Sequence, residues 1–214
     1  MRDLDKAQVD RALAEIATIR HHMARGMEFR GYGPAALAAT GLMALAAAAM
    51  QAAMLVDPLA ELPRYLALWL ATAAAAATLI GTEAIARTHR MHSGLAPEML
   101  AAAAEQFLPA AAAGILLTAV LVRFAPEASW MLPGLWQLVF SLGVFASLRF
   151  LPRRIFVAGV WYLLCGLACL AVGREGAALS PWAMGIPFGV GQLLLAVVLR
   201  SKTWDHHGET EGCA

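Results

Sequence analysis

The sequence predicts an all-α integral membrane protein, a polytopic bundle of six transmembrane helices preceded by an amphipathic helix. Composition is the first reason: 60% of the 214 residues are hydrophobic and 14% are charged, whereas a soluble surface needs roughly a quarter charged residues. Patterning is the second, because the apolar residues gather into six segments of about the length that crosses a bilayer as a helix. We therefore divide the chain into a cytoplasmic helical segment (1–33), a six-helix membrane domain (34–200) and a polar cytoplasmic tail (201–214).

The first expected element is a polar helix at residues 3–29, whose apolar positions recur at close to a helical period. Two roles stay open for it. Arg20, Arg25 and Arg30 suit a helix that lies on anionic lipid, and the apolar stripe suits docking to a cytoplasmic partner or a second subunit. The stretch "RGYGP" at 30–34 is expected to end this helix before the first span.

Six spans follow, joined by short polar or proline-containing linkers, of which "RTHRMHSGLAPE" at 87–98 is the longest. We expect the spans at 34–56, 65–85, 107–124, 131–150, 155–172 and 181–199. Thirteen of the 16 Lys and Arg residues lie on one side of this arrangement, and Arg64, Arg123 and Arg174 lie on the other. The positive-inside rule then makes both termini cytoplasmic, in a multi-pass protein of the bacterial inner membrane.

Aromatic residues fall near the expected outer ends of spans two, four and six, where rings with a polar group favour the lipid headgroup layer. These residues are Tyr65, Trp130, Trp136 and Trp182. The same three spans each begin at a proline turn, "LPRYLALWL", "LPGLWQLVF" and "SPWAMGIPF", which suggests one hairpin repeated three times. Repeats of this kind often hold a binding site at their interface; the alternative is that proline is simply favoured in the first turn of a helix.

Several chemistries are excluded by what the expected spans lack. They contain no lysine and no histidine, which excludes a retinal Schiff base and a haem held between transmembrane histidines. Acidic side chains are absent from the middle of every span, although Glu83 and Glu105, near the cytoplasmic ends of spans two and three, are candidates for the mouth of a cavity. Because no membrane-enzyme motif and no basic face is present, we expect no enzymatic activity, no cofactor and no nucleic-acid partner.

The segment "GIPFGVGQ" at 185–192 is the main candidate for a cavity. Pro187 removes a backbone donor and frees a carbonyl one turn earlier, and the glycines favour either local unwinding or close helix packing. One interpretation is a broken helix that lines a small-molecule or ion cavity between the hairpins; the other is a tightly packed bend. The candidate lining residues are Pro187, Gly189, Gln192, Gln137 and Thr40.

The histidines all lie in segments expected to be cytoplasmic. His89 and His92, three residues apart, could ligate one ion from a helix end, and His206 and His207 in the tail could add nitrogen ligands for zinc or a similar transition metal. Cys165 and Cys169 are four apart in span five, where we interpret them as small apolar residues. Histidine is common at aqueous surfaces, so the default interpretation of all six is a solvated side chain.

Two stretches, "FRGYGP" before span one and "PFGVGQ" in span six, resemble those of small bacterial inner-membrane proteins that have six spans and a charged N-terminal helix. The resemblance implies a fold and a membrane location but no activity. Two hypotheses therefore stand: a small transporter or channel-like protein, and a membrane-anchored regulatory or assembly subunit. Both imply contact with the lipid bilayer, and both favour a homo-oligomer or a membrane or cytoplasmic protein partner.

Overall fold

The computed structural model describes residues 33–90, 96–148, 153–173 and 179–205, and the regular secondary structure of these residues is all helical. The predicted all-α class is therefore confirmed for the described part of the chain. The elements are α2 (Pro34–Met54), α3 (Leu62–Arg90), α4 (Ala96–Phe124), η1 (Pro126–Met131), α5 (Leu132–Ser147), η2 (Arg153–Ile155), α6 (Phe156–Val172) and α7 (Pro181–Asp205). The expected N-terminal amphipathic helix, with Arg20, Arg25 and Arg30, lies outside the described residues.

Five of the described helical segments are long and apolar enough to cross a membrane. They are Pro34–Met54, Leu62–Ala86, Glu105–Phe124, Pro126–Ser147 and Pro181–Arg200. The remaining expected span, the fifth at 155–172, forms α6, an apolar helix of 17 residues. At about 1.5 Å per residue this helix is about 25 Å long, at the short end of the range for a transmembrane helix. The apolar helices identify the chain as a membrane protein.

The helices on either side of the second linker are longer than expected. α3 continues to Arg90 and α4 already begins at Ala96, so most of the expected linker is helical. The physical reason is that the hydrocarbon layer sets only the length of the apolar stretch. Past the membrane surface a helix continues wherever its residues favour it, because the backbone hydrogen bonds remain satisfied in water.

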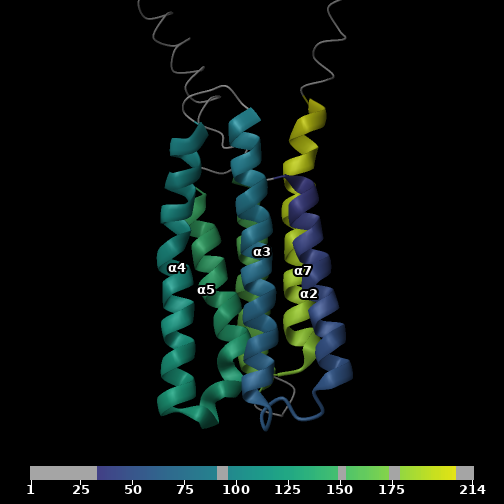
Figure 1. Cartoon of the computed structure of the whole chain (residues 1–214), viewed down its shortest axis with the longest axis vertical. Coiled ribbons are helices and arrows are strands. Elements are labelled where there is room, and N and C mark those ends of the chain that lie inside the picture. Colours follow the sequence, from purple (N-terminus) through teal and green to yellow (C-terminus); the bar gives the residue numbers. More distant parts are fainter. Residues whose placement is uncertain (1–32, 91–95, 149–152, 174–178, 206–214) are drawn as a thin grey trace, which may run out of the picture.

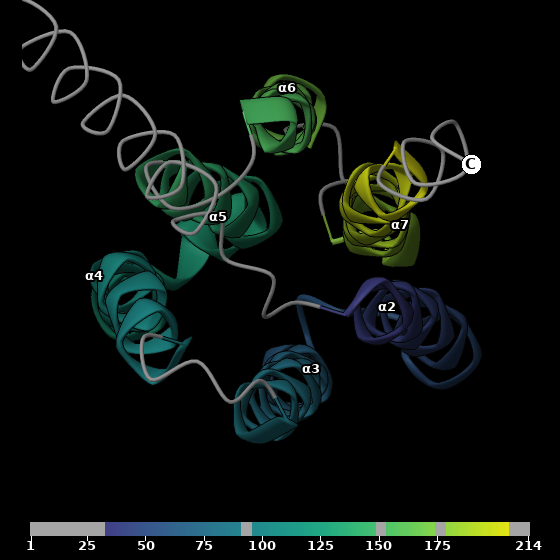
Figure 2. The same ribbon diagram turned by 90° about the horizontal axis from the view of Figure 1, so that it is seen from above.

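Neighbouring helices run in opposite directions (Figure 1), and seen from above they form a ring in chain order, with α7 lying against α2 to close it (Figure 2). The closest packing joins α2 to α7 and α5 to α6, so it lies between the predicted hairpins rather than within them. Glycine makes both contacts. A Cβ on Gly41 of α2 would lie 3.0 Å from the carbonyl oxygen of Gly189, and a Cβ on Gly134 of α5 would lie 2.8 Å from that of Gly166.

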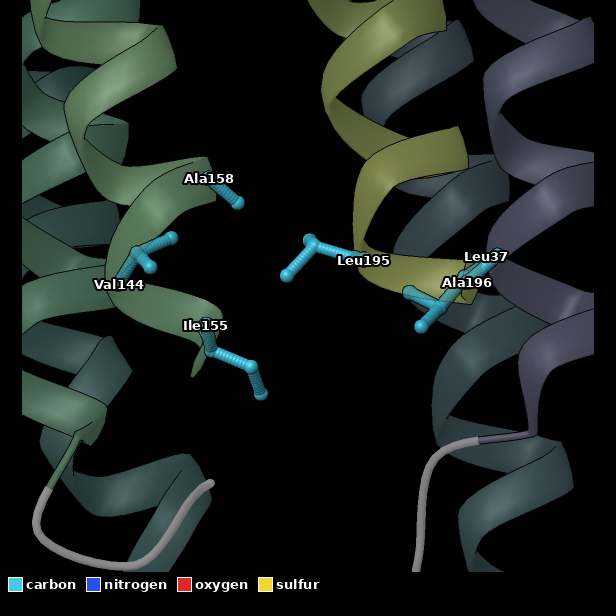
Figure 3. Packing of buried hydrophobic residues seen from close by; sticks show 6 residues of the cluster. All are labelled: Leu37, Val144, Ile155, Ala158, Leu195 and Ala196. Carbon is cyan, nitrogen blue, oxygen red and sulfur yellow. The ribbon is translucent and has the colours of Figure 1, made fainter. Parts of the chain in front are cut away.

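The bundle interior holds two apolar clusters. The first contains Leu37, Val144, Ile155, Ala158, Leu195 and Ala196. Figure 3 shows that its side chains come from both sides of the bundle, with Val144, Ile155 and Ala158 facing Leu195 of α7. The second contains Ala47, Ala48, Tyr65, Trp69, Leu179 and Met184. Burial of these side chains joins α2, α3, α5, α6 and α7.

Tyr65 and Trp136 lie near the starts of α3 and α5, as expected, but they pack against protein. Tyr65 is fully buried, and its ring stacks on that of Trp136 with the centroids 6.4 Å apart. The Trp136 indole nitrogen donates a hydrogen bond to Thr118 Oγ1 on α4 at 2.8 Å. Both aromatics therefore face protein, whereas Trp182 is half exposed. A proline turn places aromatic residues on a helix but does not decide which side of that helix faces lipid.

Candidate functional site

Helix α7 runs through Pro187 without a break. Proline has no N–H, so the Ala183 carbonyl one turn earlier loses its helical donor. Two side chains replace it: Gln137 Nε2 donates to Ala183 O at 2.8 Å, and Cys169 Sγ lies 3.6 Å from the same oxygen. The proline turn of α7, residues 183–187, is thus held by α5 and α6, and its freed carbonyl is satisfied inside the protein, as a membrane interior demands.

The same turn has a second bond to α6. The indole nitrogen of Trp161 donates to the Pro187 carbonyl oxygen at 3.0 Å. Trp161 lies in the middle of the apolar helix α6, where an indole N–H needs a partner because lipid supplies none. The proline turn therefore binds α5 and α6 through backbone carbonyls at both of its ends.

A glutamine on α2 fixes the chain just before α7. Gln51 is fully buried, and its Nε2 donates to the Leu179 carbonyl oxygen at 2.6 Å. Its Oε1 accepts a hydrogen bond from Trp69 Nε1 of α3 at 2.7 Å. One side chain thereby ties α2, α3 and the segment that precedes α7 together.

Small residues form the contact between α7 and α2. A Cβ on Gly185 would lie 2.5 Å from the Ala48 side chain, and a Cβ on Gly189 would lie 2.9 Å from that of Leu45. The Gly189 carbonyl approaches Gly41 directly. On this side α7 lies against the backbone of α2, which leaves no room for a larger residue at Gly185 or Gly189.

Three of the five buried side-chain atoms without a hydrogen-bond partner in the described residues lie on α7 or on residues that contact it; the other two are the Tyr65 hydroxyl and Ser129 Oγ. Gln137 and Tyr162 are fully buried and Gln192 is 7% exposed. Gln137 Oε1, Gln192 Oε1 and the Tyr162 hydroxyl have no hydrogen-bond partner. The Gln192 side chain lies beside the Tyr162 hydroxyl. In an apolar surrounding each such group costs free energy, so these groups need an explanation.

Aromatic rings close the space around these groups. Phe140 of α5 makes edge-on contacts with Phe107 of α4, Tyr162 of α6 and Phe188 of α7, with centroids 5.3, 4.7 and 5.4 Å away. Gly191 lets the hydroxyl end of Tyr162 lie directly on the backbone of α7. Aromatic rings of α4, α5, α6 and α7 therefore pack together beside polar groups of three helices.

The cavity candidates predicted from the sequence fall into two places. Pro187, Gly189, Gln192 and Gln137 all take part in the packing of α7, and Thr40 lies beside Gly41 and donates to its own helix at Leu37 O, 2.8 Å away. Glu83 and Glu105 lie elsewhere. Glu83 is half-buried near the Arg90 end of α3, and Glu105 is exposed near the start of the α4 span. The structure does not bring these two carboxylates to the proline turn.

Most of the metal candidates lie outside the described residues, namely His92, His206 and His207. His89 lies in the last turn of α3, but its side chain is not among those described. Within the described ranges, no three or more His, Cys, Asp or Glu side chains come together in a way that could hold a metal ion.

Sequence reasoning missed Tyr162, Trp161 and Trp69, although all three contribute to the site. A signal was present in "VWYLLCG": an indole and a phenol in the middle of a span, far from the headgroup layers, need protein partners.

In comparisons with known proteins, no family model, no curated protein and no solved structure matches the chain.

Proposed function

We propose that this membrane protein is a small transporter or channel-like protein whose pathway follows the inner side of α7 past Pro187. The observation that supports the proposal is the group of buried polar atoms without partners, Gln137 Oε1, Gln192 Oε1 and the Tyr162 hydroxyl. A protein that serves only as a membrane anchor has no use for buried polar groups that lack hydrogen-bond partners. A passing polar molecule, or the water that accompanies it, would satisfy them.

The chemistry of the site indicates the kind of substrate. Amide oxygens accept hydrogen bonds or coordinate partly dehydrated cations, and a phenol both donates and accepts. The side chains around the proline turn are amides, phenol, thiol and aromatic rings. A small molecule or ion that binds through hydrogen bonds or carbonyl-type oxygens suits them, and a substrate that needs a fixed counter-charge does not.

Flux into proteoliposomes tests the proposal. Purified protein is reconstituted, and uptake is measured for a panel of small neutral solutes and of monovalent cations and anions. We expect uptake of at least one member above empty liposomes, and a large loss in Gln192→Leu combined with Tyr162→Phe. The control is Thr78→Val, because Thr78 is exposed and bonds only to its own helix. The proposal would be contradicted if no member of the panel is taken up, or if the double variant takes up solute at the same rate as the unmodified protein.

A second candidate, a membrane-anchored regulatory or assembly subunit, is favoured by a different observation. Only 11% and 6% of the most apolar stretches of α3 and α4 are buried, against 39% in α2 and 44% in both the η1–α5 span and α7. The described residues therefore leave most of α3 and α4 uncovered and available for contact with lipid, a second copy or a partner. Native gel electrophoresis of membranes solubilised in mild detergent separates these cases, because a subunit would migrate in a larger complex that disperses when exposed α3 alanines are replaced by leucine.

A further inference from the structure

Two exposed arginines lie at the same end of the bundle. Arg154 directly precedes the buried Ile155 at the start of α6, and Arg200 is the last residue of the apolar span of α7. Ile155 belongs to the same buried cluster as Ala196, which lies one helical turn before Arg200 (Figure 3). No described carboxylate forms an ion pair with either guanidinium. Two positive charges therefore lie near each other, where the apolar part of both helices ends.

An apolar stripe on α7 leads to Arg200. Ile186, Leu193 and Val197 are exposed, and from residue 186 to residue 199 of this helix no other residue is exposed. The steps from Ile186 through these residues to Arg200 are seven, four and three residues, so all four share one face of the helix. The exposed side of α7 is therefore a continuous apolar strip with a guanidinium at its end.

A second apolar stripe lies on α6, the neighbour of α7 (Figure 2). Val157 and Leu164 are exposed, and the half-buried Trp161 lies between them at helical spacing. The Trp161 indole nitrogen donates to the Pro187 carbonyl oxygen of α7 at 3.0 Å, so this side of α6 adjoins α7 next to Ile186. The two stripes therefore lie on the same outer side of the molecule, and we call them together the α6–α7 face.

The charge and the apolar surface of the α6–α7 face complement an anionic phospholipid. A guanidinium keeps its charge and binds phosphate oxygens through two parallel N–H groups, and basic sites between transmembrane helices commonly bind anionic headgroups. A zwitterionic headgroup would bring its own cation to the two arginines. We propose that the α6–α7 face binds an anionic phospholipid, whose phosphate pairs with Arg154 and Arg200 and whose acyl chains lie along the two stripes. This site goes beyond the proposed transport function and does not depend on it.

Lipid retention and thermal unfolding test the site. The full chain in mild detergent is titrated with phosphatidylglycerol or, separately, with phosphatidylcholine of the same acyl chains. Native mass spectrometry counts the lipid bound to each chain, and the melting temperature is recorded. We expect phosphatidylglycerol to bind more tightly than phosphatidylcholine and to raise the melting temperature further. Inorganic phosphate at the same concentration should not stabilise the protein, because it has no acyl chains; equal stabilisation by phosphate would overturn a lipid site.

Arg154→Gln combined with Arg200→Gln supplies the discriminating comparison. A basic residue at an anionic lipid surface contributes about fivefold to binding, so the double variant should raise the dissociation constant of phosphatidylglycerol about thirtyfold. Arg64→Gln with Arg123→Gln is the matched control, because it removes two exposed charges at the opposite end of the bundle. Unchanged affinity in the first variant, an equal loss in the control, or equal binding of both lipids would overturn the site. The comparison of the two lipids on the unmodified protein decides the matter even if a variant fails to fold.

Discussion

The side-chain nitrogen of Gln137 on α5 lies 2.8 Å from the carbonyl oxygen of Ala183 on α7, the backbone acceptor whose helical donor is missing at Pro187. Residues 46 apart in the chain thus complete one helical turn between them. The arrangement follows from the absence of water in a membrane: a carbonyl released by proline must find a donor within the protein, and a neighbouring helix supplies it.

The dependence of Gln137 on Pro187 is measurable as a coupling free energy. Gln137→Leu should lower the free energy of unfolding by about 1–2 kcal/mol, because Ala183 O loses its main donor while the removal of the unpaired Oε1 offsets part of the cost. In a Pro187→Ala background the same change should cost clearly less, since the restored N–H takes over. Thermal unfolding in detergent of the four proteins measures this coupling, and strictly additive changes would contradict it.

Glycine at the α5–α6 contact should be intolerant of even one methyl group. A Cβ on Gly134 would lie 2.8 Å from both the Gly166 carbonyl oxygen and Leu170 Cγ, so Gly134→Ala should destabilise the fold by about 1–3 kcal/mol through overpacking. Gly81→Ala is the matched control, because nothing lies within 4 Å of its Cβ position on α3. That change should be neutral or stabilising through helix propensity. Equal melting temperatures of the two variants would contradict the close approach of α5 and α6.

The cytoplasmic position of the C-terminus, predicted from the distribution of Lys and Arg, can be tested with the native thiol Cys213. In a protein with Cys165→Ala and Cys169→Ser, an impermeant maleimide should label Cys213 only after spheroplasts are lysed. Ala60→Cys with Cys213→Ala, an exposed position between α2 and α3, should be labelled in intact spheroplasts. The reverse pattern would invert the topology.

Metal content per chain decides the role of the histidines. We expect purified, tag-free protein to contain no stoichiometric transition metal by inductively coupled plasma mass spectrometry, because histidines in polar segments are solvated by default. The comparison is His89→Ala with His92→Ala. A stoichiometric zinc that disappears in this double variant would establish a ligand pair at the end of α3 and move the centre of function to that face of the membrane.

Apolar run length and charge placement carry most of the fold prediction. They depend on how each segment partitions between water and hydrocarbon, which is a property of local sequence, and they predict the helices, their order and the position of Pro187 within α7. Local helix propensity past the membrane surface is what lengthened α3 and α4 beyond the predicted spans. The sequence alone also predicts that Pro187 frees a carbonyl.

Only the tertiary structure decided which residue donates a hydrogen bond to that carbonyl and which side of each helix faces protein. Gln51, Gln137 and Gln192 look alike in sequence, yet the first is fully bonded, the second caps Ala183 with one atom left over, and the third has an unpaired oxygen beside Tyr162. Tyr65 likewise reads as a headgroup residue and lies in the core. Lipid and protein interior are both apolar, so hydrophobicity cannot tell them apart; close contact between helices does, through the positions of glycine and the need of each buried polar group for a partner.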